Sequence, residues 1–311
     1  MTGSPISARR LSWFELSARH RIAALLDARS FQELIGPEEG VSSPHLLQFD
    51  LPVAFDDGIV IGSGRLDGKP VLIAAQEGRF MGGSIGEVHG AKLVGLLRAA
   101  RTLAATGRMH GCLLLLDTGG VRLQEANAGE TAAAEAVRAV LDARNAGVSV
   151  VALLGGRAGC FGGGSLIAAC CSHIVMSEHA RLGVSGPEVI EAYKGAEEFD
   201  SQDRALAWRV LGGTTRRLLG SADALIDDTT AAFRQAAIAQ LQRPRPLDVA
   251  RLQTEHLRLR ERVRRFGDCR DGAEIARRVL GPAAVHEFEE LSTQDVERLI
   301  TTLPEVAHDA R

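Results

Sequence analysis

Three short apolar runs, each bordered by segments with helical periodicity, constrain the fold of this chain most strongly. They cover residues 112–117, 148–154 and 174–177. The first two are apolar without alternation, which indicates strands buried on both faces of a sheet. Strands that alternate with helices are typical of parallel pairing through crossover helices. The sequence therefore predicts an α/β fold.

Other segments extend this prediction in both directions. Residues 8–35 have the spacing of a helix, and residues 58–62 and 70–75 predict a hairpin that turns at Asp67-Gly68. Further helices are predicted at 87–106, 131–145 and 163–171 and from Pro187, Asp203 and Thr229. We expect an N-terminal helical extension (1–40), a central domain (41–242) and an Arg-rich helical extension (243–311), with residues 243–246 as a linker.

Composition excludes several classes of function. A net charge of −3 and an aromatic content of 4% argue against a nucleic-acid-binding surface. The five cysteines include no Cys-x-x-Cys pair, which excludes a zinc ribbon and favours buried, reduced thiols. The sequence contains neither a signal-peptide pattern at residues 1–10 nor a long apolar run. We therefore expect a cytoplasmic protein.

Three glycine-rich segments lie next to predicted strands or at helix starts. They are residues 81–86, 117–120 and 155–164. Glycine lets main-chain N–H groups approach a ligand without a Cβ in the way. Two such groups from neighbouring loops would form an oxyanion hole, whereas the simpler interpretation is that the glycines only permit tight turns.

Two phosphate-binding motifs are excluded by spacing. No Gly-x4-Gly-Lys-Ser/Thr segment occurs, which rules out a P-loop. Gly62-Ser63-Gly64 is followed by Asp67 where a dinucleotide fingerprint needs glycine.

The glycine segments also resemble those of a known family. Residues 159–183 (GCFGGGSLIAACCSHIVMSEHARLG) resemble the crotonase segment, and residues 117–125 (DTGGVRLQE) and 80–86 (FMGGSIG) resemble its carboxyltransferase branch. Residues 18–34 resemble the N-terminal segment of that branch. The resemblance implies a crotonase-like (ClpP/crotonase) spiral of ββα units.

Two departures from the patterns of related proteins narrow the choice of family member. The zinc ribbon of bacterial acetyl-CoA carboxylase β subunits is missing, and Leu166 stands where crotonase hydratases carry a catalytic glutamate. Within the branch, the length and the Arg-rich tail are most similar to malonate decarboxylase β subunits.

The chemistry implied by the resemblance is decarboxylation of a malonyl thioester on an acyl-carrier protein. The product would be an acetyl thioester formed through an enolate, and no metal, flavin or nicotinamide is implied. The substrate would ride on a phosphopantetheine-type arm or on CoA. A homologous γ subunit would complete the active site. Carried over by position, the first oxyanion donor would be the main-chain N–H of Gly119 or Gly120. The second would be the main-chain N–H of Gly163, with Gly162 as its neighbour.

Five further residues are weaker candidates for contact with substrate. By position, Gly82 and Gly83 would shape the floor of the site or the acyl pocket. Ser165 follows the glycine triplet and could bond to a substrate carboxylate. His89 could deliver a proton from the start of a helix, although a structural role is also open. Glu188 lies near the position of the second crotonase carboxylate, but the local spacing differs by two residues. The alternative interpretation is a surface or helix-cap acid.

The last segment is rich in arginine. Eight arginines fall between residues 243 and 265. They would form either a solvated helix face or a docking surface for an acidic carrier protein or its phosphates.

Two alternatives to the decarboxylase remain open. One is a biotin-dependent carboxyltransferase subunit, which avidin would inhibit. The other is a non-catalytic subunit that only binds acyl thioesters.

Overall fold

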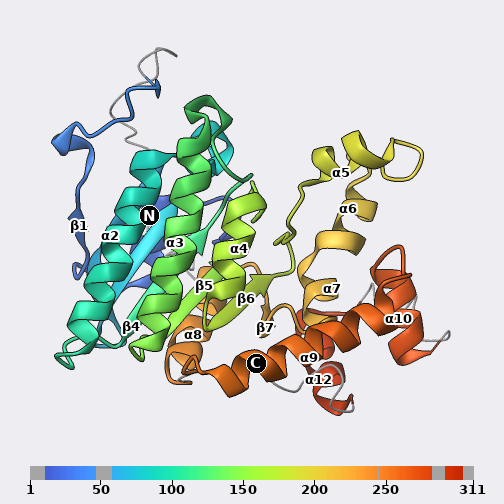
Figure 1. The fold of residues 1–311 in the computed structure, drawn as a ribbon. Coiled ribbons are helices and arrows are strands. Elements are labelled where there is room, and N and C mark those ends of the chain that lie inside the picture. Colours follow the sequence, from blue (N-terminus) through green and yellow to red (C-terminus); the bar gives the residue numbers. More distant parts are fainter. Residues whose placement is uncertain (1–10, 47–57, 244, 282–290, 304–311) are drawn as a thin grey trace, which may run out of the picture.

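The protein is built around one mixed sheet, which lies between two layers of helices (Figure 1). The computed structural model describes residues 11–46, 58–243, 245–281 and 291–303 of the chain. Seven strands follow one another in the sheet in chain order. They are β1 (Gln32–Leu34), β2 (Ile59–Leu66), β3 (Lys69–Gln76), β4 (Gly111–Leu116), β5 (Val150–Leu154), β6 (His173–Ser177) and β7 (Ala224–Ile226).

The sheet changes from antiparallel to parallel at β3. Strands β1, β2 and β3 are antiparallel neighbours, and β3 to β7 are all parallel. The β2–β3 hairpin turns at Asp67 (φ 53°) and Gly68 (φ 72°), the pair of positive φ angles that a two-residue type I′ turn requires. The predicted hairpin and the predicted parallel sheet are both confirmed.

Helices cover both faces of the sheet. The described helices are α1 (Ala18–Leu25), α2 (Glu87–Ala104), α3 (Asn127–Asn145), α4 (Gly162–Cys170), α5 (Pro187–Lys194), α6 (Arg204–Leu211), α7 (Gly213–Leu218), α8 (Thr230–Leu241), α9 (Val249–Phe266), α10 (Gly272–Leu280) and α12 (Thr293–Thr302). Helices α2, α3 and α4 pack on one face, and α1 and α8 pack on the other (Figure 1). In β4, Leu114 points into the first core and Leu113 into the second. This burial on both sides explains why the run is apolar without alternation.

The C-terminal helices form a smaller core beside β7. Leu218 of α7, Ile275 of α10 and Ile300 of α12 pack together there with Leu225 of β7. Helix α9 contains no buried residue. The expected helical character of the C-terminal segment is therefore found in its described parts.

The predicted long helix at residues 8–35 is wrong over most of its described length. Helix α1 is capped by Ser17 and ends at Leu25, and β1 follows and pairs with β2. The main chain of Asp27 donates to the Arg65 carbonyl, and its carboxylate accepts from the amides of Asp67 and Gly68. Pairing with the hairpin therefore overrides the helical spacing.

The cysteines and helices of the described residues bear on the predictions of reduced thiols and of no membrane span. All five cysteines are free thiols, three of them buried, and burial raises the pKa of Cys112 to about 12. Among the described helices, none combines the length and the apolar character needed to cross a bilayer.

Candidate functional site

A second, short layer of strand pairing lies beyond the carboxyl ends of the main strands. Single parallel bridges join Ile85 to Val121, Thr118 to Cys160, and Cys160 to Leu182. Each of β3, β4, β5 and β6 is thus followed by a bridged segment and then by a helix. Four successive strand–bridge–helix units result, and the glycine segments lie in this second layer.

The structure brings two of the predicted glycine clusters side by side. A Cβ built on Gly162 would lie 3.0 Å from the Cα of Gly120, and one on Gly163 would lie 3.2 Å from Cγ1 of Val121. Gly120 (φ 131°) and Gly162 (φ 53°) both have positive φ angles, which glycine adopts without strain. The loop after β4 and the start of α4 therefore meet at one point.

Three of the four glycine amides expected to face a ligand are already hydrogen-bonded. Gly119 N donates to Gly82 O (2.8 Å), Gly120 N to Thr118 Oγ1 (3.0 Å) and Gly162 N to Val184 O (2.9 Å). The amides of Gly119, Gly120 and Gly162 therefore hold the loops together. Of the four, only Gly163 N has no hydrogen bond to a described residue.

Val121 supplies a second amide of this kind. Its N–H makes no hydrogen bond with the described part of the chain. Ile85 N donates to Gly120 O (2.8 Å), and in a trans peptide the next N–H points the opposite way. The Val121 amide thus points away from Ile85, toward the side on which Thr118 pairs with Cys160. Sequence reasoning missed Val121, because neither the tertiary bond of Gly119 to Gly82 nor the local bond of Gly120 to the Thr118 hydroxyl is visible in the glycine pattern.

The Gly163 amide belongs to the first turn of α4. The first N–H groups of a helix have no partner within the helix and carry partial positive charge. Phe161 O accepts from Gly164 N and Ser165 N, so the Gly163 N–H is the one left over in this turn. Two unbonded amides on adjacent loops are the arrangement that stabilises an oxyanion.

Gly82 and Gly83 shape the wall beside these loops. Gly82 O accepts the Gly119 amide. A Cβ on Gly83 would lie 1.9 Å from the carbonyl oxygen of Asp117, so no larger residue fits there. Both glycines thus lie against the loop after β4, and their expected role in shaping the floor of the site or the acyl pocket stays a prediction.

A buried ion pair anchors the loop that follows β4. Arg21 of α1 donates to Asp117 (2.8 Å), and the side chains are 2% and 4% exposed. The other Asp117 oxygen accepts from Ala158 N (2.7 Å), in the loop after β5. A Cβ on Gly156 would overlap this carboxylate at 2.0 Å. One carboxylate therefore fixes both loops. No periodic pattern in the sequence points to its partner Arg21.

A second buried ion pair fixes the start of α2. Arg122 and Glu125 are fully buried and 2.9 Å apart. Glu125 accepts from Glu87 N, and Arg122 donates to Ser84 O (2.8 Å). The charged residues of the GGVRLQE segment thus anchor the loop beside Ile85, and neither faces solvent.

His89 is a buried structural residue in this arrangement. Gln76 Oε1 accepts from Asp117 N, so Gln76 Nε2 must donate to His89 Nε2 (3.0 Å). One ring nitrogen of His89 is therefore occupied by Gln76. This contact favours the structural role over proton delivery.

Ser165 and Glu188 lie beside the site without pointing a free donor into it. The Ser165 hydroxyl donates to Gly162 O (2.7 Å), which engages its proton within α4. Glu188 is exposed in the first turn of α5. Its Oε2 would lie 3.5 Å from a Cβ on Gly186, the residue before that helix. These positions favour the helix-cap interpretation of Glu188 and a local role for Ser165.

His173, at the start of β6, predicts a pH-dependent stability. Its side chain is buried, its Nε2 lies 2.6 Å from Arg243 O, and burial lowers its pKa to about 4. Because the unfolded chain protonates near pH 6.5 and the folded chain does not, stability is lost as pH falls from 6.5 toward 4. We expect a loss of about 3 kcal/mol over this range, measured by urea unfolding. The His173→Gln variant should lose much of this slope, and an unchanged slope would contradict the assignment.

The described residues contain no cluster of His, Cys, Asp and Glu suited to a metal ion. What the site offers is main-chain N–H groups at the carboxyl ends of β4 and β5, framed by strand–bridge–helix units. These features define a crotonase-like α/β protein of the carboxyltransferase type.

Comparison with known proteins gives the family. Residues 15–215 match the model of the carboxyl transferase domain, and the chain belongs to this family. It is 40% identical over 243 residues, 75% of this chain and 76% of the relative, to the malonyl-S-ACP:biotin-protein carboxyltransferase of Malonomonas rubra. The crotonase-like fold predicted from the glycine segments is confirmed.

Two solved structures extend the comparison. A Pseudomonas malonate decarboxylase hetero-tetramer in complex with malonate contains a chain that is 45% identical, with a TM-score of 0.75. The match covers 83% of this chain and 91% of that one. A Pseudomonas malonate decarboxylase hetero-dimer matches at 39% identity and a TM-score of 0.66, covering 83% and 100%. The chain is thus a carboxyltransferase-family subunit related to malonate decarboxylase.

Proposed function

We propose that this chain is the β subunit of a malonate decarboxylase, which converts malonyl-S-(acyl-carrier protein) into acetyl-S-(acyl-carrier protein) and CO2. The observation that carries the proposal is the pair of amides of Val121 and Gly163, unbonded within the described chain and placed on adjacent loops. When the carboxylate leaves as CO2, the electron pair of the broken C–C bond moves toward the thioester oxygen. The two N–H groups would donate to that oxygen, and each such donor is worth about 3–4 kcal/mol.

The substrate is inferred from the names of the relatives. The Malonomonas rubra protein is named for malonyl-S-ACP, and the Pseudomonas hetero-tetramer was solved with malonate. We carry both over to this chain as a malonyl thioester on the phosphopantetheine-type arm of a carrier protein. No covalently bound cofactor is needed for this step. After CO2 departs, the enolate carbon takes a proton, which we do not assign to His89, Ser165 or Glu188.

We further propose that a homologous γ subunit completes the site. Large apolar side chains around the glycine loops are exposed: Leu123 by 79%, Val184 by 68% and Leu166 by 51%. Val184 accepts the Gly162 amide, and Leu166 lies on α4. Large exposed apolar side chains that gather in one region are typical of a site of protein–protein contact. Both Pseudomonas structures are hetero-oligomers, which supports this proposal.

The proposed activity is tested by measuring CO2 release from malonyl-S-(acyl-carrier protein). The chain is assayed alone and after co-expression with a homologous subunit, each with and without avidin. We expect release only from the pair, unaffected by avidin. Release from neither preparation would overturn the proposal.

The second candidate is a biotin-dependent carboxyltransferase, in which the carboxyl group passes to biotin. The name of the Malonomonas rubra relative favours it. In the same assay, avidin would then abolish turnover, and CO2 would not appear without a biotinylated protein.

A further inference from the structure

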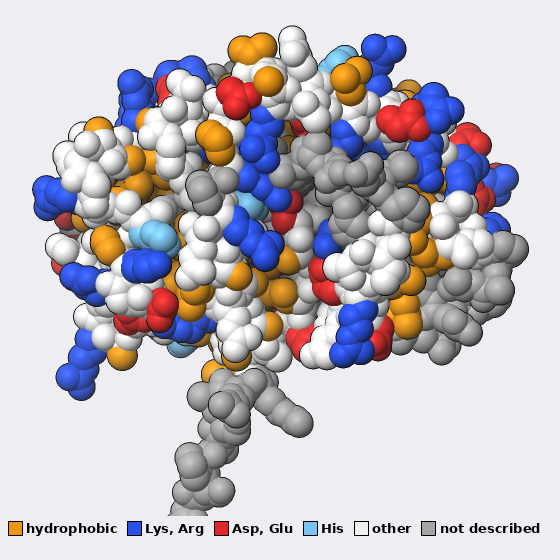
Figure 2. Space-filling model, turned by 90° about the horizontal axis from the view of Figure 1, so that it is seen from below, with side chains coloured by type: hydrophobic (Ala, Val, Ile, Leu, Met, Phe, Trp, Pro, Cys, Tyr) orange, Lys and Arg blue, Asp and Glu red, His pale blue; other side chains and the backbone are white. Residues whose placement is uncertain are grey.

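The eight arginines at residues 243–265 do not form one uniform charged face. Several make contacts within the chain. Arg258 forms an ion pair with Glu255 and Arg264 with Glu261, and Arg262 donates a hydrogen bond to Ser221. Arg245 pairs with Asp223 (2.7 Å). Figure 2, viewed from the side on which α9 lies in Figure 1, shows Lys and Arg side chains scattered among acidic, polar and apolar ones on this face. The side chain of Arg251 makes no hydrogen bond or ion pair with a described residue and needs a separate explanation.

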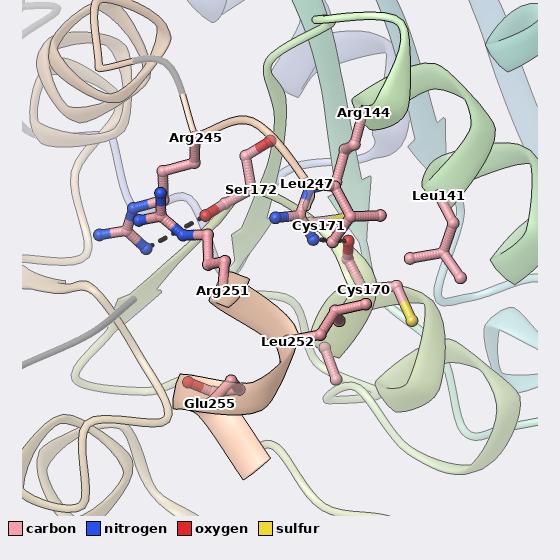
Figure 3. A pocket seen from close by; sticks show the side chains of 11 residues that line it. Leu141, Arg144, Cys170, Cys171, Ser172, Arg245, Leu247, Arg251, Leu252 and Glu255 are labelled. Carbon is pink, nitrogen blue, oxygen red and sulfur yellow. Dashed lines mark hydrogen bonds between the residues drawn. The ribbon is translucent and has the colours of Figure 1, made fainter. Parts of the chain in front are cut away.

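Arg251 lines a cavity together with two other arginines. The cavity has a volume of about 160 Å³ and lies between α9 and the ends of α3 and α4. Arg144 reaches it from α3, Arg245 from the segment before α9, and Arg251 from the first turn of α9 (Figure 3). Leu141, Leu247 and Leu252 supply apolar walls. The space is several times that of one water molecule, about 30 Å³.

The charges around this cavity are not balanced. Arg144 is buried and donates to Cys170 O (2.6 Å), but its Nε has no partner among the described residues. Burial, together with the nearby charges of Arg251 and Arg245, lowers the pKa of Arg144. Asp223 forms an ion pair with Arg245. Glu255, which also lines the cavity, forms an ion pair with Arg258. Within the described part of the chain, the guanidinium groups of Arg144 and Arg251 form no ion pair with a carboxylate.

Like charges gathered around one cavity are costly where burial weakens their solvation, and an anion between them offsets this cost. Guanidinium groups bind phosphate and carboxylate oxygens with paired donors. The first turn of α9 is capped by the Asp248 carboxylate, which accepts from the Arg251 amide, so the positive charge of the cavity is that of its guanidinium groups. Arg144 of α3 has a structural role as well, because its guanidinium donates to Cys170 O, a terminal carbonyl of α4.

We propose that the cavity formed by Arg144, Arg245 and Arg251 binds a small oxyanion, a phosphate or a short carboxylate. It lies beside Cys170 and Ser172, at the end of α4 opposite the glycine loops and just before β6 begins. The site is therefore separate from the proposed oxyanion hole. Its occupation does not depend on the decarboxylase assignment.

The proposal is tested by calorimetric titration of the full chain with inorganic phosphate and, separately, with acetate, with ionic strength held constant by NaCl. We expect saturable binding of at least one anion, and Arg251→Gln should weaken it about 10-fold or more, since a charged hydrogen bond is lost. Arg260→Gln is the matched control, because Arg260 is exposed on the same helix and does not line the cavity.

The outcomes separate the possible sources of the anion. Saturation by phosphate alone assigns a phosphate site, and saturation by acetate as well assigns a general carboxylate or phosphate site. Absence of saturable binding by either anion overturns the proposal. Equal affinity in the Arg251→Gln variant and the unchanged chain also overturns it.

Discussion

Replacing Gly163 by alanine is expected to lower CO2 release by the assembled complex about 100-fold or more. A Cβ at this position would lie 2.7 Å from the Cβ of Ala133 and 3.2 Å from Cγ1 of Val121. The start of α4 must then move away from α3, and the Gly163 amide moves with it. Loss of one donor from an oxyanion hole costs a factor of about 100–1,000. The measurement is single-turnover decarboxylation of malonyl-S-(acyl-carrier protein).

The matched control for this variant is Gly95→Ala on α2. A Cβ on Gly95 meets no atom within 4 Å, and alanine is favoured over glycine inside a helix. This control should retain full activity. Co-purification with the partner subunit separates a lost donor from a lost fold. Full activity in a folded, assembled Gly163→Ala complex would contradict the proposed role of this amide, whereas weakened binding without a change in chemistry would favour a non-catalytic subunit.

The Arg21→Met variant is expected to lower the free energy of unfolding by about 3–5 kcal/mol. It leaves the Asp117 carboxylate buried, 4% exposed, without its cation. Because Asp117 also accepts the Ala158 amide, both loops at the site lose their common anchor. Activity should therefore fall even at temperatures where the variant stays folded. Urea unfolding and the CO2 assay measure the two effects.

The control for the ion pair is Arg157→Met. Arg157 and Glu15 pair at 3.0 Å, but their side chains are 51% and 56% exposed. An exposed pair contributes about 0–1 kcal/mol, so this variant should be close to unchanged. If Arg21→Met and Arg157→Met had equal effects, the special importance of the buried pair would be refuted.

Much of the fold could be predicted because its signals are local. The apolar run at β4 and β5 and the turn at Asp67-Gly68 each follow from a few neighbouring residues. Strand β1 was missed because its partner β2 lies about 30 residues away and because residues 8–35 keep a helical spacing. Strand β7 was missed because it has only three residues.

The glycine clusters predicted from the sequence lie on loops that the structure brings together, but the unbonded amides there belong to Val121 and Gly163. The glycine clusters marked the loops after β4 and β5, which do meet. Which amide remains free depends on bonds such as Gly119 to Gly82 and Gly162 to Val184, and these join segments that no local pattern relates. The buried pairs of Arg21 with Asp117 and Arg122 with Glu125 were missed for a related reason. Charged residues are ordinarily expected at the surface.

The two proposed donors are peptide groups, and this limits how the enzyme can be regulated. A peptide N–H does not titrate near neutral pH, and no side-chain reagent removes it. The polarising power of the Val121 and Gly163 amides is therefore constant across the physiological pH range. Any optimum in the decarboxylation profile must then originate in the protonation step, the carrier arm or the second subunit. Neither position carries an ionisable side chain that could be exchanged. To change the strength of these donors by mutation, the backbone must be shifted by altering the residues that hold it in place.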